Sequence, residues 1–166
     1  EYRKQPRDLP AFIRGNPNRP GPVVPRRFLT VLSHSESTYK NGSGRLELAD
    51  SLTTDAAPLT ARVIVNRIWL AHFGQGIVDT PSNFGTQGDP PTHPELLDDL
   101  AADFITNGWS IKRLHREILL SATWQQSCSP TPQQETIDPN NRWLSRMNPR
   151  QLTFEEWRDA MLVGGD

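Results

Sequence analysis

Four histidines are the side chains best suited to proton transfer near neutral pH, because an unperturbed imidazole titrates there. They are His34, His72, His93 and His115. Their spacing matches none of the local patterns that bind zinc, such as two histidines four residues apart on one helix. The sequence therefore predicts no metal and no other cofactor in this chain. The alternative left open is a metal site formed by residues that are distant in the sequence and converge in the fold.

The segment 75–92 is the most favourable place for a functional site, because a loop of this length in a compact domain is commonly functional. Asp79 lies in it and His93 directly follows it, so the two could form a carboxylate–imidazole pair that orients a general base. Asn83 is a further binding candidate there. The alternative is a rigid strap, with Phe84 in the core and the polar groups serving turns.

His115 is a second acid/base candidate, although it falls on the apolar face of a predicted helix at 111–123. On such a face, a hydrogen-bonded core histidine is the favoured interpretation. The acidic face of the preceding helix, with Glu95, Asp98, Asp99 and Asp103, is interpreted as a solvated surface.

Polar residues on an otherwise apolar helix at 58–74 form a further candidate site. Arg62, Asn66 and Arg67 could bind an anion, or they could form a structural network with nearby acids. Trp69 and Trp157 lie on apolar helical faces and are expected in the core. Trp109 and Trp124 flank the predicted helix at 111–123 and are the only candidates for exposed stacking platforms, although a core position is the favoured interpretation for the tryptophans as a group.

Composition limits the possible partners. The 166 residues include 18 basic and 19 acidic side chains, a formal charge of −1 that does not favour nucleic acid. The single cysteine, Cys128, can form neither an internal disulfide nor the C-x-x-C-H pattern that attaches c-type haem. No run of 18 apolar residues and no secretory leader occurs, so we expect no direct membrane insertion.

Proline and helix-capping signals divide the chain into two parts. Residues 1–44 are expected to form an extended, Pro/Gly-rich arm with a short strand at 11–14 and a flexible loop at 33–44. Residues 45–166 are expected to form an irregular, mainly α domain of about five helices. Capping boxes are predicted at Thr92–Glu95 and Thr153–Glu156, a helix stop at Gly108, and a short helical segment from Asp138. Because the last helical pattern runs almost to Asp166, we expect the domain to be a truncated part of a larger one.

Motifs along most of the chain resemble a known family. They are GRLELAD at 44–50, LTARVIVNRIW at 59–69, HFGQGIV at 72–78, TPSNFG at 80–85, PTHPELL at 91–97 and DPNNR at 138–142. This combination resembles the planctomycete-specific domain of unknown function that follows cytochrome-type domains in large bacterial envelope proteins. The resemblance implies a secreted or periplasmic setting and haem c elsewhere in the parent polypeptide, and it implies no reaction.

Three functions are compatible with these observations. The leading hypothesis is a non-catalytic helical scaffold or interaction module that contacts other domains of the same polypeptide, with the long loop as a contact surface for a partner or polysaccharide. The first alternative is an envelope enzyme acting on complex polysaccharide, with His93 or His115 as acid/base and Asp79 orienting it. The second is a docking surface for a c-type haem module in electron transfer.

Overall fold

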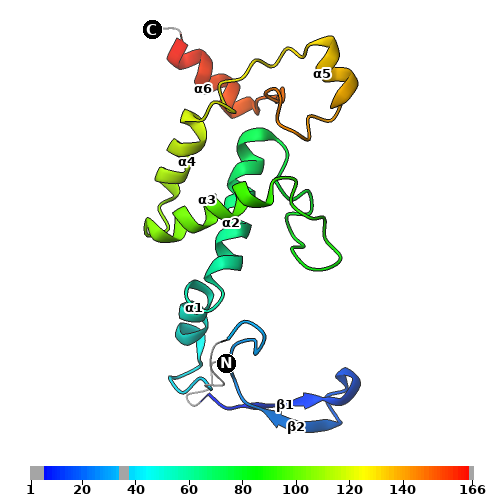
Figure 1. Cartoon of the computed structure of the whole chain (residues 1–166). Helices are drawn as coiled ribbons and strands as arrows, with labels where there is room; N and C mark the ends of the chain where they lie inside the picture. The colour runs from blue at the N-terminus through cyan, green and yellow to red at the C-terminus, as the bar shows by residue number, and fades with distance from the viewer. Residues whose placement is uncertain (1–5, 34–37, 165–166) are drawn as a thin grey trace. The chain divides into compact units, whose positions relative to one another are not determined.

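The computed structural model of the protein describes residues 6–33 and 38–164, so part of the predicted loop at 33–44, including His34, lies outside the described residues. Two compact units make up the chain, Glu1–Thr60 and Ala61–Asp166. Within the described residues there are six α-helices and one two-stranded sheet (Figure 1). The prediction of a mainly α chain is confirmed.

A β-hairpin begins the first unit. Strand β1 (Leu9–Phe12) pairs antiparallel with β2 (Pro20–Val24), and a 3-10 turn, η1 (Ile13–Gly15), follows β1. The sequence places the first strand two residues too late and misses the second. Proline has no backbone N–H to donate to a neighbouring strand. Both strands of a two-stranded sheet are edge strands, however, and an edge strand tolerates proline.

An arginine ties the base of the hairpin to the segment before the first helix. The Arg26 Nε donates to Asp8 Oδ1 at 2.8 Å, and its Nη1 donates to the carbonyl of Gly42 at 2.8 Å. The hydrogen bonds that the Arg26 side chain and backbone N–H donate to Asp8 hold the pKa of Asp8 below its ordinary value. Helix α1 (Arg45–Thr53) then begins at residue 45, where the sequence predicts the start of the helical part.

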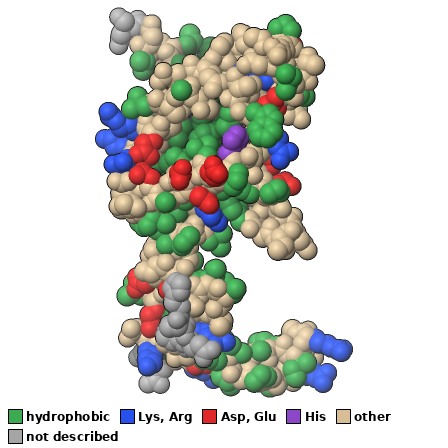
Figure 2. Space-filling model, viewed as in Figure 1, with side chains coloured by type: hydrophobic (Ala, Val, Ile, Leu, Met, Phe, Trp, Pro, Cys, Tyr) green, Lys and Arg blue, Asp and Glu red, His purple; other side chains and the backbone are tan. Residues whose placement is uncertain are grey.

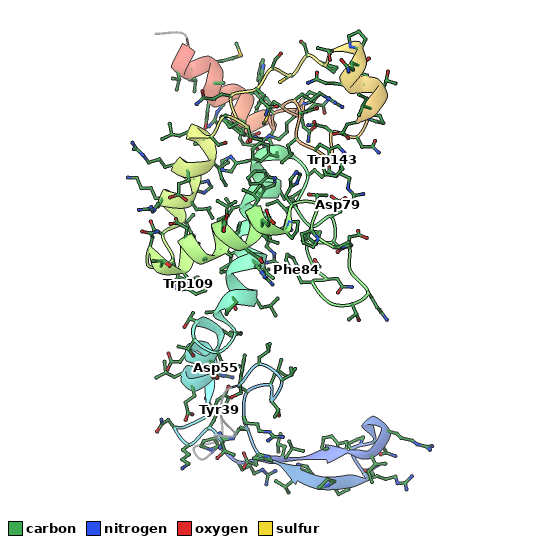
Figure 3. All side chains as sticks on the ribbon, in the orientation of Figure 1. Tyr39, Asp55, Asp79, Phe84, Trp109 and Trp143 are labelled. Carbon is green, nitrogen blue, oxygen red and sulfur yellow. The ribbon has the colours of Figure 1, made fainter. Side chains whose placement is uncertain are left out.

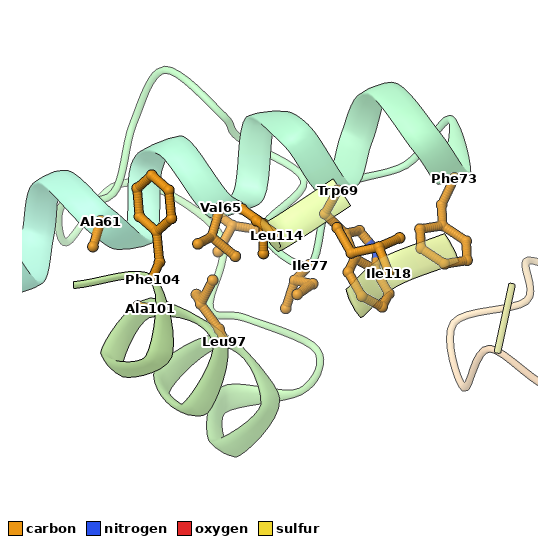
Figure 4. Packing of buried hydrophobic residues seen from close by; sticks show 11 residues of the cluster. Ala61, Val65, Trp69, Phe73, Ile77, Leu97, Ala101, Phe104, Leu114 and Ile118 are labelled. Atoms are coloured by element: carbon orange, nitrogen blue, oxygen red, sulfur yellow. The ribbon is translucent and has the colours of Figure 1, made fainter. Parts of the chain in front are cut away.

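Helix α2 (Ala57–Phe73) is the central helix of the second unit. Its residues Ala61, Val65, Trp69 and Phe73 recur every four positions and therefore form one face, which is buried. Figure 4 shows this face packed against residues of α3 (Pro94–Thr106) and α4 (Ile111–Leu120), which contribute Leu97, Ala101, Phe104, Leu114 and Ile118. Helix α2 therefore organises the core of the second unit.

The connection between α3 and α4 follows from its sequence. Gly108 has a φ of +69°, a conformation that glycine adopts without strain. Its N–H donates to Ile105 O at 3.1 Å, and Trp109 N–H donates to Phe104 O at 2.9 Å, the paired bonds of a Schellman motif. Ser110 then caps α4 by accepting from Arg113 N–H at 3.3 Å. The predicted stop at Gly108 is confirmed.

Two predicted helix starts are wrong. His93 rather than Thr92 is the N-cap of α3, because the Thr92 hydroxyl donates to the Ile77 carbonyl at 3.2 Å. Asp138 ends helix α5 (Pro132–Ile137) instead of starting a helix. Its carboxylate accepts from the N–H groups of Arg142 and Trp143, both at 2.8 Å, and so stabilises a turn.

The last helix, α6 (Phe154–Gly164), begins at the capping box that the sequence predicts. Thr153 N–H donates to Glu156 Oε2 at 2.8 Å, and Glu156 N–H donates to Thr153 Oγ1 at 3.2 Å. Across the described part of the chain, no helix combines the length and apolarity that crossing a membrane requires.

Truncating Leu114 to alanine is expected to cost about 2–5 kcal/mol of unfolding free energy, because it opens a cavity in this core. The matched change Leu120→Ala, on an exposed position of the same helix, should cost less than about 1 kcal/mol. Urea unfolding followed by tryptophan fluorescence measures both. Equal losses for the two variants would contradict the assigned core.

Candidate functional site

A buried asparagine fixes the start of the segment between α2 and α3. Asn66 is 0% exposed, and its Oδ1 accepts from Val78 N–H at 2.8 Å while its Nδ2 donates to Val78 O at 3.0 Å. Gly76 makes this approach possible, since a Cβ there would lie 2.5 Å from Val78 O and 3.0 Å from Asn66 Oδ1. The amide therefore satisfies two backbone groups that would otherwise be buried without partners.

The C-terminal end of the segment is held by Ile77, the residue that precedes Val78 in the chain. Thr92 N–H donates to the Ile77 carbonyl at 2.8 Å, and Ile77 is buried. Between the two anchors, Thr80 bonds to the backbone of Asn83 and Asp89, and Phe84 packs on the core (Figure 3). We call the segment 75–92 the strap, because its two ends are joined to one another and to α2.

The strap does not bring its predicted acid/base residues together. Asp79 is exposed and accepts from Gln75 Nε2 at 3.0 Å. His93 is half-buried, with its Nδ1 3.0 Å from Thr92 Oγ1 and its ring edge-on to Trp143 at 6.2 Å. Among the hydrogen bonds and ion pairs of the described residues, none joins Asp79 to His93. Asn83 is exposed and uses its Oδ1 to accept from Gly85 N–H.

His115 contacts His72, which is not among the site residues predicted from the sequence. Its Nδ1 lies 2.6 Å from Nε2 of His72 in the last turn of α2, and both side chains are half-buried. The ring of Trp124 packs nearly perpendicular to that of His72, with ring centroids 5.3 Å apart. The two histidines are 43 residues apart, so no local spacing could have indicated the pair.

The polar strip of α2 is divided among different roles. Arg62 pairs with Asp98 of α3 at 2.6 Å, an ion pair at the surface that contributes less than about 1 kcal/mol. Asn66 holds the strap, and Arg67 is exposed. Figure 2 shows acidic side chains gathered where α3 lies in Figure 1. Two carboxylates of α3, Asp98 and Asp103, form ion pairs with Arg62 and Arg113 respectively.

The tryptophans that the structure exposes are not Trp109 and Trp124, the two candidates for exposed platforms. Trp109 packs edge-on to Phe104 with centroids 5.3 Å apart, and Trp124 packs edge-on to Phe73 at 5.6 Å, so both are half-buried against the core. Trp157, expected in the core, is 52% exposed, and Trp143 is 65% exposed. Trp69 is buried as predicted. Whether Trp109 or Trp124 binds anything remains a prediction.

Trp143 borders a groove of about 350 Å³ between α5 and the turn that follows it. The groove is also lined by Ile137, Thr131, Gln133 and Ser145. Gln134 on its wall is already engaged, because its side chain bonds Thr131 and the carbonyl of Ser145. Within the described residues, no cluster of three or more metal-binding side chains occurs in this groove or elsewhere.

Replacing Asn66 by alanine is expected to lower the unfolding free energy by about 2–5 kcal/mol, because the N–H and C=O of Val78 would be left buried without partners. Asn83→Ala, which removes an amide exposed on the same strap, should cost less than about 1 kcal/mol. Chemical denaturation measures the unfolding free energies of the two variants. A strap that tolerated both changes equally would not be held by Asn66.

Comparison with known proteins identifies one family. A family model described as "PSD1: Protein of unknown function (DUF1553)" matches residues 44–166. The searches of curated proteins and of solved structures gave no match. Because the family model matches well over half of the chain, from the residue before α1 onward, the chain belongs to the PSD1 family of proteins of unknown function.

Proposed function

We propose that this chain is a non-catalytic helical interaction module and that α6 is its docking element. The observation that carries the proposal is the exposure of large apolar side chains on this helix. Phe154, Trp157 and Met161 are 69%, 52% and 59% exposed. Their spacing of three and four residues places them on one face.

The docking face is presented by a well-anchored helix. Besides the capping box, Arg150 Nη2 donates to Glu156 Oε1 at 2.8 Å, and the Thr153 N–H and the Arg150 guanidinium hold the pKa of Glu156 below its ordinary value. Figure 2 shows hydrophobic side chains at the surface where α6 lies in Figure 1. An apolar face exposed on an anchored helix is typical of a surface that packs against a partner.

The positions of the acid/base candidates support a non-catalytic role. Asp79 bonds Gln75, His93 bonds Thr92 and His115 bonds His72, so each side chain has a separate local partner. An Asp79–His93 general-base pair would need the two side chains within hydrogen-bond reach, and no hydrogen bond joins them among the described residues. These contacts instead stabilise the strap and the junction of α2 with α4.

The partner we propose is another domain of the same polypeptide, secreted or periplasmic and carrying c-type haem upstream. The motifs at 44–50, 59–69 and 138–142 support this setting through their resemblance to the domain that follows cytochrome-type domains. In that setting, the face of α6 would be covered within the parent protein. The 166-residue chain alone leaves it open to solvent.

Hydroxyl-radical footprinting tests the docking role. Trp157 and Met161 should be oxidised at least several-fold more slowly in the natural full-length polypeptide than in this chain alone, because a covered side chain excludes the radical. Leu9, exposed on the hairpin, serves as a reference position. Equal oxidation of Trp157 and Met161 in both forms would show that the face has no intramolecular partner.

A second candidate function is contact with polysaccharide through the groove beside Trp143. An exposed indole provides an apolar platform for a sugar ring, and the side chains of Gln133, Thr131 and Ser145 supply polar groups at the same groove. This groove is distinct from the face of α6. It therefore adds a binding surface without replacing the docking role.

Trp143→Ala is expected to abolish the retardation of the chain in native gels that contain soluble β-glucan or xylan, because the stacking platform is removed. The matched control is Trp157→Ala, which removes an equally large exposed indole on α6 and should leave retardation unchanged. If wild-type chain migrates through every polysaccharide gel as through a plain gel, the groove is not a sugar site.

A further inference from the structure

The contact between His72 and His115 has an unusual requirement for protons. The Nε2 of His72 and the Nδ1 of His115 are 2.6 Å apart, and the rings meet edge-on with centroids 4.9 Å apart. In such a contact one nitrogen must carry the proton and the other must accept it. The contact therefore exists with both rings neutral or with one ring charged, but not with both charged.

Two cations act on His72. One is His115 of α4 when charged, and the other is Arg150, from the segment before α6, whose Nη1 donates to the carbonyl of Ala71 at 3.3 Å. Arg150 itself is paired with Glu156. The indole of Trp124, which carries no charge, also packs against His72 with the two rings nearly perpendicular. Burial, then His115 and Arg150, hold the pKa of His72 below its ordinary value of 6.5.

We propose that the His72–His115 contact is a pH-sensitive latch that joins the last turn of α2 to α4 at neutral pH and opens in mild acid. Protonation of the second imidazole places two donors and two positive charges where one hydrogen bond had been. The bond is then replaced by repulsion, and the rings separate. The latch acts on the core directly, because Phe73 and Leu114, the neighbours of the two histidines in the chain, are both buried.

The direction of the pH dependence follows from linkage. Because the pKa of His72 is lower in the folded state, the unfolded chain binds more protons as the pH falls through 6.5. The stabilisation is complete above that pH and is lost as the pH falls toward the lower folded value. For one proton, the ratio of folded to unfolded chain falls by at most tenfold per pH unit.

Nitrogen-15 NMR of the imidazole rings in the whole chain, titrated from pH 8 to pH 4, tests the latch. The expected result is that the two rings titrate in separate steps, the second at lower pH than the first, with shift changes at Phe73 and Leu114 in that second step. Two independent titrations near the ordinary value, without changes at the neighbouring core residues, would overturn the proposal.

Unfolding by urea at pH 7 and pH 5 supplies the second measurement. The wild type is expected to lose stability between these pH values, His72→Gln to lose markedly less, and the control His93→Gln to behave as the wild type. An equal pH dependence in all three would overturn the latch.

Stabilisation of the wild type by Zn²⁺ that His72→Gln abolishes would make the pair a metal site and would also overturn the latch. If His72→Gln does not fold, the NMR titration of the wild type decides.

Discussion

The two hydrogen bonds between the Asn66 side chain and the backbone of Val78 are the constraint on which the second unit depends. The amide lies on the same helix as the buried face of Val65 and Trp69, so it joins the strap to the core at a point where water is excluded. A buried backbone group without a partner costs about 1–3 kcal/mol, which makes this position intolerant of an apolar residue. Gly76 belongs to the same constraint, because only a residue without a Cβ lets Val78 approach the amide.

Once Val78 is fixed, its neighbours position α3. Ile77 fills the core with its side chain and accepts two hydrogen bonds from Thr92 with its carbonyl, so the two ends of the strap meet one residue before the N-cap of α3. Leu97, Ala101 and Phe104 then pack against α2, and the Schellman motif at Gly108 turns the chain into α4. The side chains of Thr80, Asn83 and Thr92 therefore stabilise the strap itself.

The sequence predicts well those features that depend on residues close together in the chain. The four-residue recurrence of Ala61, Val65, Trp69 and Phe73 is enough to identify the central helix, and Gly108 and the Thr153–Glu156 box mark helix ends from side-chain chemistry alone. Tertiary contacts decide the rest. Thr92 has the spacing of a cap, but its hydroxyl bonds Ile77, and the His72–His115 contact joins positions too distant for any motif. Trp157 has a core-like pattern, yet the described residues leave it exposed.

The direct test of this account is amide hydrogen exchange at Val78, read against other positions of the same chain. Val78 lies outside every helix and strand, so local structure alone predicts rapid exchange. Because its N–H is buried on Asn66, we predict that it exchanges with the slowest class, together with Val65 and Trp69, whereas Gly85, bonded to the exposed Asn83, exchanges rapidly. Exchange at Val78 as fast as at Gly85 would contradict the account.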